Sequence, residues 1–254
     1  MKNEYDVSDI AWRVYRIMYE DFFNDGKIVG DIGNKRPHLD YCFNEKNKEI
    51  SIHLSGDTDF NYTKGFAWTR LPTYQKMIKN NPEHKELEIM YTNNLNILEE
   101  LTYSVVNISL IPQTGNVQSF KQGIGNDRLD TYIWALNAYY QNKNCLIFNH
   151  SSYDNMSVLK AYYDSFKGTY YDYPNIYDYC DKIYKINETL ADDLIESGKK
   201  AIDSPVRIME FMKLTMHFWN QKAAYIRSKA ENCKEVLYAL DDYDKKIRLL
   251  FSKK

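Results

Sequence analysis

The stretch KQGIGNDRLDTYIWALNAYYQNK, from Lys121 to Lys143, predicts a helix that is apolar around most of its circumference. Trp134, Ala135 and Ala138 continue the apolar surface round the side opposite its main apolar face. A helix of this kind is buried, so the rest of the fold is expected to pack around it. The main face is formed by Leu129, Tyr132, Ile133, Leu136, Tyr139 and Tyr140.

Segments with strand character lie on both sides of this helix. The alternating residues of HLDYCF and KEISIHLS flank the turn-rich NEKNK, which predicts a β-hairpin from about Leu39 to Ser55. A polar loop is expected over Gly56–Gly65. The β-branched run SVVNISLIP, Ser104–Pro112, predicts a buried strand that stops at its proline. A further short strand is predicted at Cys145–Phe148.

Most of the remaining chain has helical periodicity, and the strand signals fade after His150. The sequence therefore predicts an α+β, helix-dominated fold, with a small sheet in the first 150 residues and a mostly helical remainder. With no repeat and no Pro/Gly-rich linker, we expect a single domain over residues 1–254, with an α+β core at 1–150 and a helical subdomain at 151–254. Helices are predicted at residues 6–24, 82–103, 154–166, 175–186, 187–198, 204–228 and 234–254.

Composition excludes several classes of function. The 33 basic and 35 acidic side chains of the 254 residues nearly balance, so nucleic acid is not an expected partner. The sequence contains no apolar run of about 18 residues and no signal-peptide pattern, so we expect a cytoplasmic protein without a membrane partner. Widely spaced cysteines and histidines give neither a zinc motif nor a disulfide pattern, and no resident metal is expected.

The start of the central helix has two interpretations. Gly123 and Gly125 before a helix N-terminus resemble a phosphate-binding turn, but Arg128 occupies the place of the third glycine in the dinucleotide motif. A capped helix start explains the residues better. Asp127 would accept a hydrogen bond from the Asp130 backbone while Asp130 reaches back, an acidic variant of the capping box.

Two polar residues remain unexplained on this apolar helix. Asp130 and Asn137 share one strip about two turns apart, and buried polar groups need partners. The strip is either part of a structural network, involving Arg128 or His150, or it lines a pocket. The candidate site therefore consists of Asp127, Arg128, Asp130 and Asn137, with His150 as a ligand-binding candidate.

A second polar cluster lies on the loop predicted after the hairpin. Asp57, Asp59 and Lys64 are either turn residues or a metal-binding or general-base group at a strand end. If Asp57 and Asp130 met in space, they would suit hydrolysis of a phosphate ester assisted by Mg²⁺ or Mn²⁺. Asp57 and Lys64 are therefore further ligand-binding candidates.

The segment from Tyr162 to Ile186 contains eight tyrosines interleaved with aspartates. Its acids argue against single-stranded nucleic acid, which requires basic residues between the aromatic ones. The tyrosines, Tyr173 among them, are either anchors for a protein or small-molecule partner or residues at the boundary of the core. The last helix, with Val236 and Leu240 on its apolar face, either covers the domain or pairs with a second copy of the chain.

Several of these motifs occur in the order found in an uncharacterised bacterial family known only as a domain of unknown function. LSGD at Leu54–Asp57, the strand ending at Pro112, DRLD and VLKAYYDSF carry this resemblance, which covers roughly Leu54 to Tyr184. The chain departs from the family at Leu129, where an aromatic residue is usual. It also has a shorter loop after Pro112 and lacks a Trp-rich N-terminal segment. The resemblance implies that Asp127, Arg128 and Asp130 are a shared feature, and it implies no reaction.

Two hypotheses follow from the sequence. The leading one is a cytosolic bacterial or phage protein that binds a protein partner or a small ligand, through the Tyr-rich segment or a pocket beside Asp130. The alternative is a metal-assisted phosphoester hydrolase, acting as a nuclease or nucleotide hydrolase. In that case Asp57 and Asp130 would serve as metal ligands or base and Arg128 would steady the anion. Whether the protein is an enzyme stays open.

Overall fold

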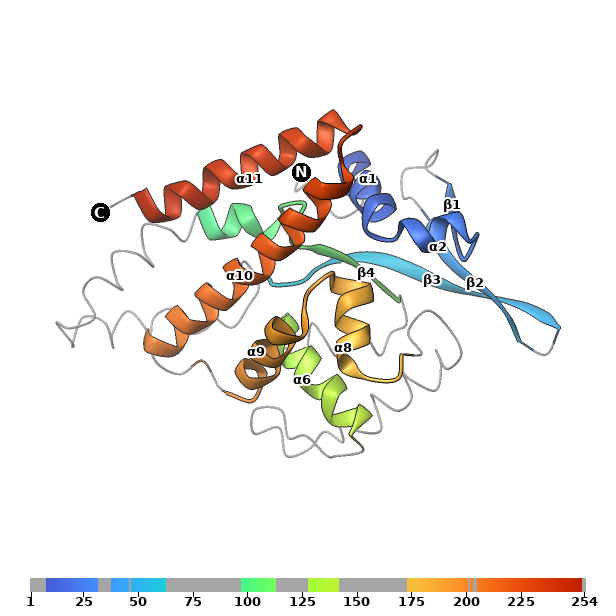
Figure 1. Ribbon diagram of the computed structural model, residues 1–254, viewed down its shortest axis with the longest axis horizontal. Coiled ribbons are helices and arrows are strands. Elements are labelled where there is room, and N and C mark those ends of the chain that lie inside the picture. The colour runs from blue at the N-terminus through green and yellow to red at the C-terminus, as the bar shows by residue number, and fades with distance from the viewer. Residues whose placement is uncertain are drawn as a thin grey trace.

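A computed structural model describes residues 8–31, 38–45, 47–62, 97–112, 128–141, 173–200, 202 and 205–252. It contains a four-stranded antiparallel sheet in the order β1-β2-β3-β4, with helices packed around it (Figure 1). The strands are β1 (Ile28–Asp31), β2 (His38–Glu45), β3 (Lys48–Thr58) and β4 (Ile108–Pro112). The predicted α+β, helix-dominated fold is confirmed.

The predicted hairpin forms from β2 and β3. Its register runs from Leu39 opposite Leu54 to Glu45 opposite Lys48, with Asn47 at a positive φ of 63° in the turn. The polar loop expected from Gly56 was placed too early. β3 continues to Thr58 because β4 supplies backbone partners along this stretch, such as Ser109 opposite Asp57.

The predicted first helix is divided into two by Tyr19. Tyr19 has φ −117° and ψ 28°, and its hydroxyl donates to the Ile183 carbonyl at 3.0 Å and accepts from the Leu110 amide at 3.1 Å. These two bonds hold the residue between segments distant in sequence. The helical elements are α1 (Asp9–Met18), α2 (Glu20–Asn24), α6 (Leu129–Tyr140), α8 (Ile176–Tyr179), the π-helical turn η4 (Cys180–Tyr184), α9 (Glu188–Gly198), α10 (Pro205–Lys229) and α11 (Lys234–Ser252).

The central helix α6 is buried as predicted, and among the described helices it packs most extensively against α9 (Figure 1). β4 contacts both α1 and η4, and α10 contacts α1, α9 and α11. The apolar face of α11 buries Val236, Leu240 and Tyr243, so this helix covers the domain. Tyr238, on its outer side, is 71% exposed.

Some predicted features lie outside the described residues. They include the strand at Cys145–Phe148, the helix at residues 154–166 and the first part of the helix expected from Pro82. The candidate residues Lys64, Asp127 and His150 also lie outside them. Among the described helices, none combines the length and the apolar character that a membrane span requires. The division into a core and a helical subdomain stays a prediction.

Candidate functional site

Arg128 and Asp130 form a buried ion pair at the start of α6. Arg128 Nε donates to Asp130 Oδ1 at 3.0 Å and Nη2 donates to Oδ2 at 2.5 Å, with exposed fractions of only 3% and 0%. The guanidinium carbon also lies 5.1 Å from the centre of the Phe211 ring. A two-point pair of this kind orients both side chains and gives the buried carboxylate its required partner.

Helix α9 completes the surroundings of this pair. The Ser197 hydroxyl donates to Asp130 Oδ2 at 2.8 Å, and the Ser197 carbonyl lies 3.5 Å from Arg128 Nη2. Gly198 follows directly and packs against the α6 backbone. The Asp130 carboxylate therefore accepts hydrogen bonds from Arg128 and from α9.

The sequence offered two kinds of partner for Asp130, the helix N-terminus in a capping box and Arg128 in a structural network, and the second is observed. In the capping box its carboxylate would reach back to the helix N-terminus, whereas it bonds Arg128 and Ser197. The sequence left two interpretations of the polar strip, a structural network or the lining of a pocket. Asp130 belongs to a structural network that includes Arg128. Asn137 lies apart from it, half-buried two turns along α6, where its Oδ1 is 3.4 Å from Gln141 Nε2. Asn137 is not brought to the Arg128–Asp130 pair.

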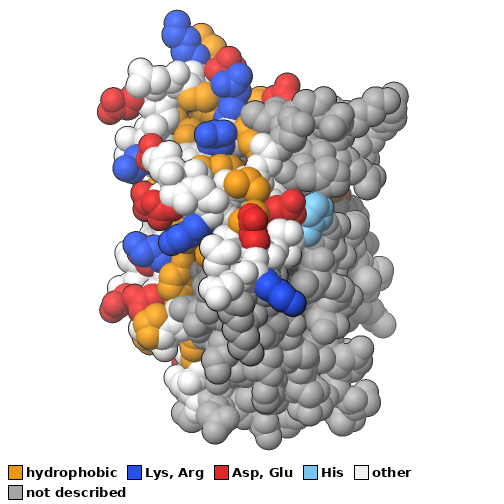
Figure 2. Space-filling model, turned by 90° about the vertical axis from the view of Figure 1, so that its right-hand side faces the viewer, with side chains coloured by type: hydrophobic (Ala, Val, Ile, Leu, Met, Phe, Trp, Pro, Cys, Tyr) orange, Lys and Arg blue, Asp and Glu red, His pale blue; other side chains and the backbone are white. Residues whose placement is uncertain are grey.

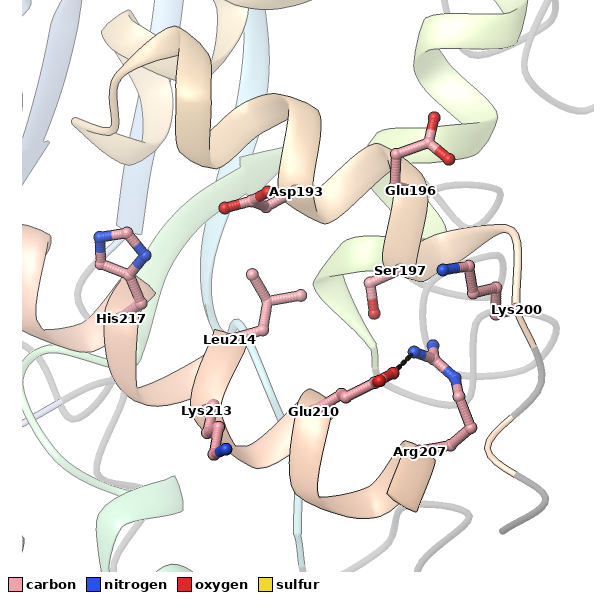
Figure 3. Close-up of a pocket in the computed structure, with 9 residues that line it drawn as sticks. All are labelled: Asp193, Glu196, Ser197, Lys200, Arg207, Glu210, Lys213, Leu214 and His217. Atoms are coloured by element: carbon pink, nitrogen blue, oxygen red, sulfur yellow. Dashed lines mark hydrogen bonds and ion pairs between the residues drawn. The ribbon is translucent and has the colours of Figure 1, made fainter. Parts of the chain in front are cut away.

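A cleft between α9 and α10 opens beside Ser197 (Figure 3). It has a volume of about 400 Å³, within the range typical of small-molecule sites. The side chains come from one face of each helix, with residues recurring every three or four positions. The cleft is lined by Asp193, Glu196, Ser197, Lys200, Arg207, Glu210, Lys213, Leu214 and His217.

Charges of both signs face this α9–α10 cleft. In Figure 3, Asp193 and His217 lie toward one end, Lys200 and Arg207 toward the other, and Leu214 between them. Two of the acids already have partners, since Arg207 pairs with Glu210 and Lys199 pairs with Glu196. For Asp193, Lys200 and Lys213, no ion pair forms within the described part of the chain.

A second buried charge cluster joins α10 to the sheet. Lys222 Nζ lies 2.6 Å from Asp59 Oδ2, 2.9 Å from Ser109 Oγ and 2.8 Å from the Ile108 carbonyl. The Ser109 hydroxyl donates to the same Asp59 oxygen at 3.1 Å. Lys222 and Ser109 are fully buried and Asp59 is 1% exposed. These groups are closed to solvent and hold the fold together.

The other predicted ligand-binding residues lie elsewhere. Asp57 is half-buried on β3, where its Oδ1 accepts from the amide of the next residue, Thr58, at 3.0 Å. Tyr173 is half-buried, and its ring meets that of Tyr179 edge-on at 6.1 Å. Burial raises the pKa of the Tyr173 hydroxyl, with a further contribution from Tyr41. Neither residue lines the α9–α10 cleft.

The tyrosines described after residue 172 mainly belong to the core. Tyr179 and Tyr184 are buried, with ring centres 5.8 Å apart, and Tyr184 packs against Phe218. Tyr177 is the exposed one, and its hydroxyl donates to Asp192 at 2.8 Å. In this part of the segment the tyrosines serve packing.

The described residues form no cluster that could bind a metal. On the face considered below, they also form no patch of basic side chains alone or of acidic side chains alone. Within the described ranges, no three His, Cys, Asp or Glu side chains converge in a way that could hold a metal ion. On the face shown in Figure 2, the described Lys and Arg side chains are interspersed with Asp and Glu. That mixture matches the balanced charge of the sequence.

Comparisons with known proteins add no relative to these observations. No family model, curated protein or solved structure matches the chain. The resemblance to a bacterial family of unknown function stays a prediction that rests on the motifs quoted above.

None of the residues that line the cleft, Ser197 included, was among the predicted site residues, and neither was Lys222. A signal was present for Lys222, since Thr215, Trp219, Lys222 and Ile226 recur at helical spacing and are all buried. The cleft residues also repeat at helical spacing along α9 and α10, but only the packing of these two helices brings them together.

Proposed function

We propose that this protein is a binding module for a small polar ligand that occupies the α9–α10 cleft. The observation that carries the proposal is the arrangement of charge in the cleft. Asp193 lies toward one end and Lys200 toward the other, and neither is engaged in an ion pair within the described residues. A ligand with a cationic and an anionic group would satisfy both.

Size and shape limit the class of ligand. A cleft of about 400 Å³ accommodates a molecule of amino-acid or dipeptide size. The ammonium group would pair with Asp193, the carboxylate would pair with Lys200, and Leu214 would contact an apolar part. Charge-assisted hydrogen bonds of this kind fix the orientation of a zwitterion.

The wall of the cleft supports binding by a rigid site. Ser197 forms part of the lining and is held by Asp130, which Arg128 holds in turn. A site whose lining is fixed before binding loses less conformational entropy when the ligand enters. The candidate residues Arg128 and Asp130 therefore support the cleft from behind.

Direct binding measurements test this function. We expect isothermal titration with free amino acids and dipeptides to identify a ligand, and Asp193→Asn and Lys200→Gln to weaken its binding by about tenfold each, as expected for a lost charge-assisted bond. Glu231→Gln and Lys245→Gln, at exposed positions outside the cleft, are the matched controls.

Three outcomes would contradict the proposal. They are the absence of binding by any amino acid or dipeptide, equal binding by the cleft variants and the controls, and stabilisation by Mn²⁺ or Mg²⁺ together with phosphoester cleavage. The last result would support the hydrolase hypothesis instead.

A further inference from the structure

Lys185 has an unusual backbone conformation at the end of the π-helical turn η4. Its φ of 59° and ψ of 40° are left-handed, and among the described non-glycine residues only Asn47 also has a positive φ. This conformation favours glycine or asparagine over lysine. The backbone conformation therefore does not explain why residue 185 is a lysine, whereas its long side chain does. Single π-helical turns also occur frequently at functional sites.

The amine of Lys185 lies between aromatic rings from two other elements. Its Nζ is 5.3 Å from the centre of the Tyr225 ring and 6.0 Å from that of the Tyr19 ring. Within the described residues, Nζ forms no ion pair and no hydrogen bond. Tyr19 is itself held in place by its bonds to Ile183 and Leu110.

A small hollow lies beside this amine. Its volume is about 50 Å³, and one water needs roughly 10–15 Å³ of a cavity measured in this way, so a molecule of a few heavy atoms fits. Acids and bases both border it, so no single charge dominates. The hollow is lined by Met18, Tyr19, Glu20, Asp21, Phe22, Lys185, Tyr225 and Lys229.

The surroundings favour the neutral form of the amine. The pKa of Lys185 is lowered to about 8, mainly by burial and also by Lys182 and Lys229, while Asp181 and Asp21 oppose this effect. Burial raises the pKa of the Tyr225 phenol, as do Asp21, Glu20 and Asp181. At neutral pH, Tyr225 therefore keeps its proton while part of the Lys185 population is unprotonated.

We propose that Lys185 is a nucleophilic amine that forms an imine with a short, uncharged aldehyde bound in this hollow. The Nζ lone pair attacks the carbonyl carbon and a C–N bond forms. The carbonyl oxygen then leaves as water with the two protons of the neutral amine, which gives the C=N bond. The small volume selects aldehydes of two or three carbons. This site is separate from the α9–α10 cleft and does not depend on its function.

Reductive trapping tests the proposal in the full chain. The protein is incubated with glycolaldehyde and cyanoborohydride at pH 7.5, and each lysine is quantified by peptide mass spectrometry. Lys182 is the control, because it lies in the same turn and its exposed ammonium pairs with Asp181 at 3.4 Å. We expect Lys185 to react at least about tenfold faster than Lys182, because its amine borders the hollow and its own pKa of about 8, below the ordinary 10.5, increases its neutral fraction.

The pH profile and a variant complete the test. The rate at Lys185 should rise with an inflection near pH 8. Lys185→Asn, which suits the left-handed backbone, should fold and lose only this modification. Reaction of Lys185 at or below the rate of Lys182, or a rate that rises toward pH 10 without the inflection, would overturn the proposal.

Discussion

A Cβ atom built on Gly198 would lie 2.2 Å from the backbone carbonyl oxygen of Asp130 and 2.8 Å from Trp134 Cβ. Real Cβ atoms do not approach a backbone oxygen so closely, so helix α9 reaches α6 only because residue 198 has no side chain. The same contact brings Ser197 onto the Asp130 carboxylate. Gly198 therefore determines both the helix packing and the position of one wall of the cleft.

Gly198→Ala is expected to destabilise the protein by about 2–4 kcal/mol, because the added methyl group forces two packed backbones apart. Urea unfolding measures the loss. Gly26→Ala is the comparison, since a Cβ there meets no atom within 4 Å and only its φ of 66° opposes the change. That variant should lose about 1–2 kcal/mol. Equal losses at the two positions would contradict the close contact.

The Arg128–Asp130 pair is expected to contribute to folding as a unit. Arg128→Met leaves the buried carboxylate with the Ser197 hydroxyl, and Asp130→Asn removes the negative charge that Asp130 places against the guanidinium. Each variant should lose about 3–5 kcal/mol, and the double variant should lose clearly less than the sum. Urea unfolding of the four proteins in this cycle gives the coupling energy.

The exposed pair between Arg227 and Asp241 provides a control for this cycle. Its atoms are 3.1 Å apart, but the side chains are 39% and 55% exposed. The corresponding cycle of single and double variants at Arg227 and Asp241 should give a coupling energy of at most about 1 kcal/mol. Additive losses at Arg128 and Asp130 would show that the buried ions do not stabilise one another.

The parts of the fold that the sequence predicted depend on local periodicity. The apolar circumference of α6 and the alternation of β2 and β3 follow from residue spacing of about 3.6 and of 2. The hairpin forms close to its predicted bounds, and α6 lies within the stretch predicted to hold the central helix. The break at Tyr19 was not predictable in this way, because its bonds join it to Leu110 and Ile183.

Candidate site residues were harder to predict because long-range packing assigns their partners. Asp59 was noted as a loop acid, yet its partner Lys222 lies 163 residues away, on α10. Asp130 was recognised as needing a partner, and Arg128 was named as one. Ser197, 67 residues further on, had no local signal. Sequence reasoning therefore identified which polar groups need partners better than it identified those partners.

Lys185 is expected to make stability depend on pH above neutrality. Its folded pKa of about 8 lies below the ordinary 10.5, so between these values the unfolded chain binds more protons and stability rises with pH. Below pH 8 the Lys185 amine is protonated in both the folded and the unfolded chain. The folded state then carries the full cost of burying its charge. Compared with Lys185→Asn, the wild type should gain about 1–2 kcal/mol from pH 7.5 to 9.5, after allowance for partial exposure.

Chemical denaturation of both proteins at each pH measures this difference. Taking the difference cancels titrations that the two proteins share, such as that of Tyr243, whose pKa is raised by burial. Lys182→Asn, at the exposed neighbour that pairs with Asp181, is the control for removing one positive charge from this turn. A flat difference for Lys185 would mean that its amine is not desolvated.

Asn107 is expected to be the most sensitive single amide among the described residues. Its Nδ2 donates to the carbonyls of Phe60 at 2.7 Å and Thr102 at 2.8 Å, and its Oδ1 accepts from the Phe60 amide at 3.0 Å and Trp219 Nε1 at 2.7 Å. The residue is fully buried. Asn107→Ala should therefore cost about 3–4 kcal/mol, because buried donors and acceptors lose their partners.

Asn107→Asp should cost more than Asn107→Ala, although it is nearly isosteric. The carboxylate would place a negative oxygen against the Phe60 and Thr102 carbonyls, where the amide now donates, inside the core. Asn137→Ala, at a half-buried amide whose contact with Gln141 is 3.4 Å, should change stability by about 0.5 kcal/mol or less. Urea unfolding of the three variants gives the ranking, and an aspartate tolerated better than alanine at position 107 would contradict the assigned donor direction.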